Sequence, residues 1–160
     1  MLKYVDTKVT FAEVPNEISL CINISNCPCA CKGCHSSYLA EDIGNKLNSD
    51  SIKELINNNK GITCICFMGG DSNPLEVDAL AQFIKINYPI KTAWYSGRQE
   101  LSKEIDLKNF DYIKLGPYIE ELGPLNSKTT NQRFYEVVQV YYEDSTFGYE
   151  LIDITYKFWK

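Results

Sequence analysis

The sequence has no long hydrophobic run and few of the residues that common catalytic motifs require. No apolar stretch approaches the ~18 residues that a membrane helix needs. The amino-terminal segment Met1 to Thr7 has no apolar core of the kind found in signal peptides. The single histidine, His35, has no evident catalytic partner, and neither a nucleophile elbow nor a Walker loop occurs. We therefore expect a cytoplasmic protein that makes no contact with membranes.

Positive charge is also scarce. Sixteen lysines and arginines stand against 21 aspartates and glutamates, which gives a formal net charge of -5, and no run of basic residues occurs. Such a chain lacks the electrostatic surface with which proteins bind nucleic acid, so we expect no nucleic-acid partner. The hydrophobic fraction of 44% is typical of a folded protein, and we expect a single domain spanning residues 1–160.

Cysteine, by contrast, is plentiful and unevenly placed. The chain has seven cysteines, and four of them lie in the segment from Cys27 to Cys34. In a reducing compartment, such crowding more often indicates metal binding or redox chemistry than a set of disulfides. The other three, Cys21, Cys64 and Cys66, fall within expected strands, where a thiol behaves as a small buried hydrophobic side chain.

Hydrophobic patterning predicts alternating strands and helices. Expected strands lie at residues 18–24, 62–68, 91–95 and 111–115, and expected helices at residues 51–57, 73–87 and 96–105. Ser51 and Glu54 have the spacing of a capping box, and Asn73 precedes a proline at a first helical position. This alternation predicts an α/β fold with a mainly parallel sheet. Aromatic-rich segments at residues 135–142 and 147–159 are expected to add strands.

Cys27, Cys31 and Cys34 have the spacing C-x3-C-x2-C on one short loop. Three thiolates on such a loop can bind one inorganic cluster, whereas a closed zinc site or an ordinary 4Fe-4S electron carrier needs a fourth ligand. Three ligands to a four-iron cluster leave one iron open to another molecule. The alternative is a structural zinc site in which His35 supplies the fourth ligand or Cys29 replaces one of the three cysteines. In the cluster interpretation, Cys29 is an additional thiol with no assigned role.

A pair of glycines ends the next expected strand, in the segment Gly69-Gly70-Asp71. Ligands of parallel α/β folds bind beyond the carboxyl ends of the strands, where glycine lets the backbone approach a ligand closely. Asp71 would supply a carboxylate for a ligand ammonium group. Alone, this segment is more often an ordinary turn, but together with the cysteine loop it indicates a binding site.

With these two motifs, the sequence resembles the radical S-adenosylmethionine (SAM) superfamily. The resemblance implies that the three cysteines of the motif hold a 4Fe-4S cluster and that SAM binds the open iron. It also implies that Gly69, Gly70 and Asp71 hold the methionine part of SAM. The sequence departs from the superfamily in two places, since most members have an aromatic residue in place of Gly33 and a glutamate in place of Asp71.

Gly33 instead resembles the glycyl-radical-enzyme activases, especially the small activating proteins of anaerobic ribonucleotide reductases. Further similarities to this branch lie in Tyr95-Ser96-Gly97, Asp111 to Tyr118, and Thr130-Asn131-Gln132-Arg133. The resemblance implies a compact partial (open) barrel with the cluster at the carboxyl ends of its strands. It places Gly33, Cys34 and His35 beside SAM, with Ser96 and Gly97 on the adjoining strand end. The last segment, Asn131 to Arg133, would serve SAM, the fold or a partner.

This branch cleaves SAM reductively, and the radical formed removes a hydrogen from a glycine of a partner protein. The resemblance thus implies an oxidoreductase in which no side chain acts as a catalytic group beyond the cluster and SAM. It implies two partners, the anaerobic ribonucleoside-triphosphate reductase, a glycyl radical enzyme, and a one-electron donor such as flavodoxin. Two alternatives remain open: a radical SAM enzyme acting on a small molecule, similar to a compact deazaguanine-type synthase, and a non-enzymatic zinc or iron–sulfur protein.

Overall fold

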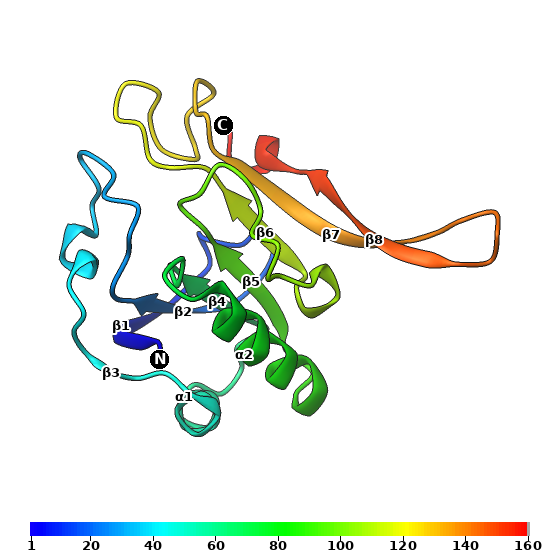
Figure 1. Cartoon of the computed structure of the whole chain (residues 1–160), viewed down its shortest axis with the longest axis horizontal. Helices are drawn as coiled ribbons and strands as arrows, with labels where there is room; N and C mark the ends of the chain where they lie inside the picture. The colour runs from blue at the N-terminus through cyan, green and yellow to red at the C-terminus, as the bar shows by residue number, and fades with distance from the viewer. Residues whose placement is uncertain (160) are drawn as a thin grey trace.

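The computed structural model describes residues 1–159 and has an α/β fold built on one open, eight-stranded sheet (Figure 1). The strand order is β3-β1-β2-β4-β5-β6-β7-β8. The strands are β1 (Lys3–Thr10), β2 (Ser19–Ile24), β3 (Asn45–Lys46), β4 (Cys64–Met68), β5 (Lys91–Tyr95), β6 (Tyr112–Leu115), β7 (Arg133–Tyr141) and β8 (Phe147–Asp153). The helices are α1 (Ser49–Asn58) and α2 (Pro74–Asn87), with short 3-10 turns at Ser37–Ala40, Leu107–Asn109 and Thr155–Phe158.

The sheet is mixed, which corrects the prediction of a mainly parallel one. Strands β2, β4, β5 and β6 are parallel to one another and form the centre. Antiparallel strands flank them, with β1 and β3 on one side and the β7–β8 hairpin on the other. The prediction found the central strands and the hairpin but not β1 or β3. Because β2, β4, β5 and β6 are parallel, their four carboxyl ends lie at the same edge of the sheet.

The helix starts follow local capping chemistry. Asn73 caps α2 by accepting a hydrogen bond from the backbone N–H of Glu76, as predicted. Helix α1 begins earlier than predicted, because Asn48 is the cap and Ser51 occupies the third helical position of the capping box. The helix predicted at residues 96–105 does not form. The hydroxyl oxygen of Ser96 accepts the N–H of Arg98 at 3.1 Å and its O–H donates to the carboxylate of Asp71, but only a short 3-10 turn follows, at Leu107–Asn109.

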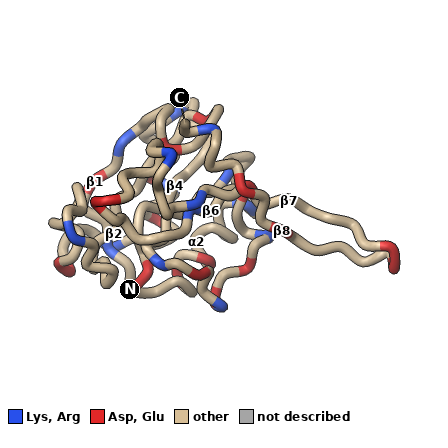
Figure 2. The backbone as a smooth tube through the Cα atoms, turned by 90° about the horizontal axis from the view of Figure 1, so that it is seen from above, with Lys and Arg blue, Asp and Glu red and all other residues tan. Residues whose placement is uncertain are grey.

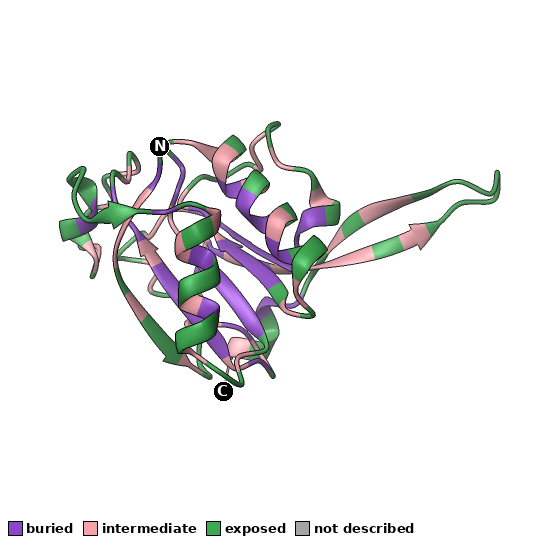
Figure 3. Cartoon of the chain, turned by 90° about the horizontal axis from the view of Figure 1, so that it is seen from below, coloured by how far each residue is buried: buried purple, intermediate pink, exposed green. Residues whose placement is uncertain are grey.

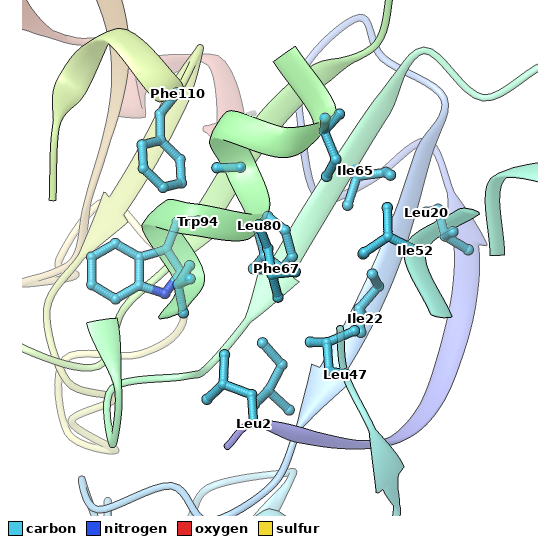
Figure 4. Packing of buried hydrophobic residues seen from close by; sticks show 14 of the residues in the cluster. Leu2, Leu20, Ile22, Leu47, Ile52, Ile65, Phe67, Leu80, Trp94 and Phe110 are labelled. Carbon is cyan, nitrogen blue, oxygen red and sulfur yellow. The ribbon is translucent and has the colours of Figure 1, made fainter. Parts of the chain in front are cut away.

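Two apolar layers enclose the central strands. On one face, α1 and α2 pack over the sheet and bury side chains such as Ile22, Phe67 and Trp94 (Figures 3 and 4). On the opposite face, the buried residues are Val14, Cys21, Cys64, Cys66, Ala93, Tyr112, Phe134 and Ile154. The prediction that Cys21, Cys64 and Cys66 belong to the core is confirmed. All seven cysteines, which lie within the described residues, are unpaired.

The β7–β8 hairpin extends well beyond the rest of the fold (Figures 1 and 2). Val137 and Leu151 are the outermost residues of the hairpin that pack against the main core. Residues 140–148, which we call the arm, lie farther out, and the acidic pair Glu143 and Asp144 is at its tip (Figure 2). Among residues 1–159, no helix combines the length and the apolar character needed to cross a membrane.

Candidate functional site

A cavity of about 180 Å³ lies at the edge where the four central strands end. It is bounded by the loops that follow β2, β4 and β5, by side chains from β6 and the loop after it, and by the residue just before β7. The lining includes all four clustered cysteines, together with Met68, Gly69, Asp71, Ser96, Gly97, Lys114, Tyr118 and Gln132. The structure thus brings together the two motifs that the sequence analysis combined, as the parallel arrangement of β2, β4 and β5 requires.

The cysteine loop, residues 27–34, is held in place by backbone contacts. The N–H of Cys27 donates to the carbonyl of Leu39 at 2.9 Å, and the N–H of Cys34 donates to the carbonyl of Cys31 at 3.2 Å. Gly33 turns with a φ of +76°, and a Cβ at this position would lie 3.3 Å from the Glu120 carboxylate. A glycine before the third cysteine therefore suits both the turn and the close approach of the loop that carries Glu120.

The thiols of the loop are half-buried and all face the same cavity, so their chemistry fits a bound iron–sulfur cluster. Within residues 1–159, no three histidine, cysteine or acidic side chains gather closely enough to hold a single metal ion. Each cysteine of a four-iron cluster binds a different iron, so cluster ligands stand farther apart than the ligands of one zinc ion. Cys27, Cys31 and Cys34 would hold such a cluster.

The glycine pair after β4 is required by both conformation and space. Gly69 and Gly70 have φ angles of +97° and +92°. A Cβ at Gly70 would lie 2.5 Å from a methyl carbon of Val77, and one at Gly69 would lie 3.1 Å from the carbonyl oxygen of Ile24. The indole N–H of Trp94 donates to the carbonyl of Gly69 at 2.7 Å, and this hydrogen bond stabilises the turn. Gly69 therefore presents backbone without a side chain to the cavity, whereas Gly70 faces Val77 in the core and does not line the cavity.

Asp71, the last residue of this motif, is buried, and its carboxylate accepts several hydrogen bonds. The hydroxyl of Ser96 donates to Oδ1, and the N–H of Gly97 donates to Oδ2 at 2.9 Å. The Cys29 thiol also donates to Oδ2, at 3.6 Å. Burial raises the pKa of the Cys29 thiol to about 12, and the charge of Asp71 adds to the effect.

Sequence analysis missed Lys114, a cation at the bottom of the cavity. Its side chain on β6 is 7% exposed, and its ammonium donates to the carbonyls of Gly116 at 2.7 Å and of Ser96 at 3.3 Å. Burial lowers the pKa of Lys114 to about 8, although Asp71 opposes the shift. The sequence did contain a signal for it, a lysine within an apolar strand. Lysine is almost never fully buried unless its ammonium is paired, so a lysine in such a strand is either exposed or held by specific partners.

Of the other predicted residues, some line the cavity and others do not. His35 is exposed, with its ring centroid 5.9 Å from that of Tyr118, and neither it nor Gly33 lines the cavity. Gln132 does line it. Asn131 donates to the carbonyl of Pro117 at 3.0 Å and so supports the turn after β6. Asn131 therefore supports the fold, and Gln132 borders the cavity.

The fold and the site together define an α/β protein with a thiol-rich site at the carboxyl ends of its parallel strands. A family model described as "4Fe-4S single cluster domain" matches residues 18–135. The match covers most of the chain, including the cysteine loop, the glycine pair and the start of β7, so this chain belongs to that family. It is an iron–sulfur protein. No curated protein and no solved structure matches the chain significantly.

Proposed function

We propose that the protein is a radical SAM enzyme of the glycyl-radical-enzyme activase type. One observation carries the proposal: three cysteines with C-x3-C-x2-C spacing line the same cavity as Gly69, Asp71, Ser96 and Gly97. The match to a 4Fe-4S family, together with the three cysteines of this chain's own C-x3-C-x2-C motif, supports a cluster with one iron open to a small molecule. The glycine turn and the polar residues of the neighbouring strand end would bind that molecule.

The roles of this chain's residues follow from their positions. Cys27, Cys31 and Cys34 would hold the cluster, and the bare backbone at Gly69 and Gly70 would lie against the methionine part of SAM. Ser96 and Gly97 would border SAM from the end of β5. When bound, the cluster supplies one electron, which breaks the bond between sulfur and C5′ of SAM and gives methionine and a 5′-deoxyadenosyl radical. The apolar walls, such as Met68 and Tyr95, would keep water from this site.

A protein substrate suits the exposure of the cysteine loop. Pro28 and Lys32 of the loop and the adjacent His35 are exposed, so a large partner could reach this segment. The radical would take a hydrogen atom from a glycine Cα of the anaerobic ribonucleoside-triphosphate reductase, leaving 5′-deoxyadenosine and a glycyl radical. The electron would come from a donor such as flavodoxin, and we expect this reaction in the cytoplasm.

The experiment is electron paramagnetic resonance of anaerobically reconstituted, reduced protein, recorded with and without SAM. We expect a reduced 4Fe-4S signal that changes on SAM addition, together with release of 5′-deoxyadenosine. Cys31→Ala should lose both iron and cleavage, whereas Cys21→Ala, which removes a core thiol, should keep both. A signal that SAM leaves unchanged would refute the radical SAM assignment and favour an electron-transfer protein.

The partner is tested separately, by adding the anaerobic reductase to the active protein and SAM. A glycyl radical signal on the reductase supports the activase assignment. Cleavage of SAM with no radical on the reductase would instead favour the small-molecule alternative. Stoichiometric zinc after reconstitution with both metals, with no bound iron, would refute both enzyme assignments.

A further inference from the structure

Cys29 has no role in the three-cysteine motif, yet its side chain makes a specific contact. Its Sγ lies 3.6 Å from Oδ2 of Asp71, a residue that is 4% exposed. The same oxygen accepts the N–H of Gly97, and the other carboxylate oxygen accepts the hydroxyl of Ser96. One buried carboxylate therefore connects the cysteine loop with the ends of β4 and β5.

The contact between Cys29 and the end of β5 is very close. A Cβ at Gly97 would lie 2.7 Å from Sγ of Cys29 and 3.0 Å from its Cβ. No side chain fits at residue 97 while Cys29 keeps this position. Through Cys29, the cysteine loop therefore packs directly on the backbone of Gly97.

The length of Asp71 matches this packing. A glutamate at residue 71 would add one methylene in the direction of Cys29, Gly97 and Ser96, where the carboxylate is already enclosed. Three donors of the protein itself occupy three of the about four acceptor positions of the Asp71 carboxylate, so most of its hydrogen-bonding capacity serves the fold. An aspartate at residue 71 and a cysteine at residue 29 are therefore complementary.

We propose that Cys29 is a positioning residue that fastens the cysteine loop to Asp71, and that it is not a ligand of the cluster. The inference rests on the proposed function where it concerns SAM, but the contact itself is a property of the protein without cofactor. The proposal predicts that Cys29 holds the cysteine loop in the position that SAM binding requires, although its side chain contacts neither iron nor SAM.

The first test is Mössbauer spectroscopy of iron-57 protein in the absence of SAM, on the wild type and on Cys29→Ala, with Pro28→Ala as an exposed control in the same loop. We expect four irons per protein in all three, with one iron already distinct from the other three in the wild type. If the distinct iron appears only after Cys29 is removed, then Cys29 is a fourth ligand and the proposal is wrong.

SAM affinity provides a second readout, measured by equilibrium dialysis on the loaded proteins. Loss of the contact in Cys29→Ala should weaken SAM binding about fivefold, and Cys29→Ser, whose hydroxyl also donates to Asp71, should restore most of it. Equal affinities in the wild type and Cys29→Ala would overturn the positioning role. Failure of the wild type to bind SAM would refute the proposed function but leave the Mössbauer comparison decisive for Cys29.

A third test needs no cofactor. In the metal-free protein, Asp71→Glu should lower the urea midpoint of unfolding because the longer side chain presses on Cys29. Adding Cys29→Ala should recover part of that loss, so that the double variant is more stable than the sum of the single effects allows. Strictly additive midpoint shifts would show that the two side chains do not interact and would overturn the proposal.

Discussion

Gly70→Ala tests the turn beside the cavity, because the structure separates two causes of destabilisation at this residue. Its φ of +92° costs an alanine roughly 1–2 kcal/mol, as left-handed backbone does for any L-residue. The added Cβ would also lie 2.5 Å from a methyl carbon of Val77, inside the packed core. Overpacking of this kind costs about 1–3 kcal/mol, so we expect a total loss of about 3 kcal/mol.

Gly61→Ala is the matched control. Gly61 has a nearly equal φ of +90°, but a Cβ there has no atom within 4 Å. We therefore expect a loss of only about 1 kcal/mol, from the backbone alone. Urea unfolding of the metal-free protein measures both, and at about 2–4 °C per kcal/mol the melting temperatures should differ by roughly 6 °C. Equal losses for the two variants would refute the claim that Val77 closes the space above Gly70.

Two pH-dependent predictions follow from buried charges outside the cysteine loop. Burial alone would raise the pKa of Glu17, but hydrogen bonds from Lys91 and Thr63, both at 2.6 Å, lower it overall. The stabilisation by ionised Glu17 is complete above the unfolded pKa of about 4.3 and is lost as the pH falls through the pKa of Glu17 in the folded state. Glu17→Gln should therefore lower the free energy of unfolding by about 2 kcal/mol at pH 7 and by less at pH 3. An equal loss at the two pH values would contradict this prediction. Burial lowers the pKa of Lys114 to about 8, so between pH 8 and about 10.4 the unfolded chain holds the extra proton. The unfolding free energy of the metal-free wild type should therefore rise relative to Lys114→Met over that range, and parallel curves would argue against a buried ammonium.

The elements that sequence alone predicted are those whose signals lie close together in the chain. Helix α2 starts at the predicted residue because Asn73, Pro74 and Glu76 carry the whole capping signal. Strand β4 is a continuous apolar run, and the cysteine loop is a local spacing. Strand β1 was missed because its lysines, aspartate and threonines are exposed or half-exposed, and it is held as a strand by pairing with β2 and β3.

The contacts that complete the site depend on tertiary structure. Cys29 reaches Asp71 because β2 and β4 are adjacent parallel strands. The register between these two strands cannot be predicted from the sequence of either one alone. The same holds for Ser96, whose hydroxyl donates to that carboxylate while also accepting the nearby N–H of Arg98. Lys114 carries a sequence signal, but its two carbonyl partners, one of which follows β5, come from the folded backbone. Spacing therefore predicted which loops form the site, while side-chain roles required the structure.

The arm has a consequence for experiments on the intact protein. Tyr141 and Phe147 of the arm are 78% and 57% exposed; their ring centroids lie 6.2 Å apart, and Phe147 also lies 6.3 Å from the ring of Tyr149. Backbone amides in residues 140–148 should therefore exchange with deuterium by local fraying, long before the central strands open. Because the start of β7 lies at the cavity and the arm extends from its other end, a fluorophore or peptide tag inserted between Asp144 and Ser145 would report on the molecule without touching the cysteine loop.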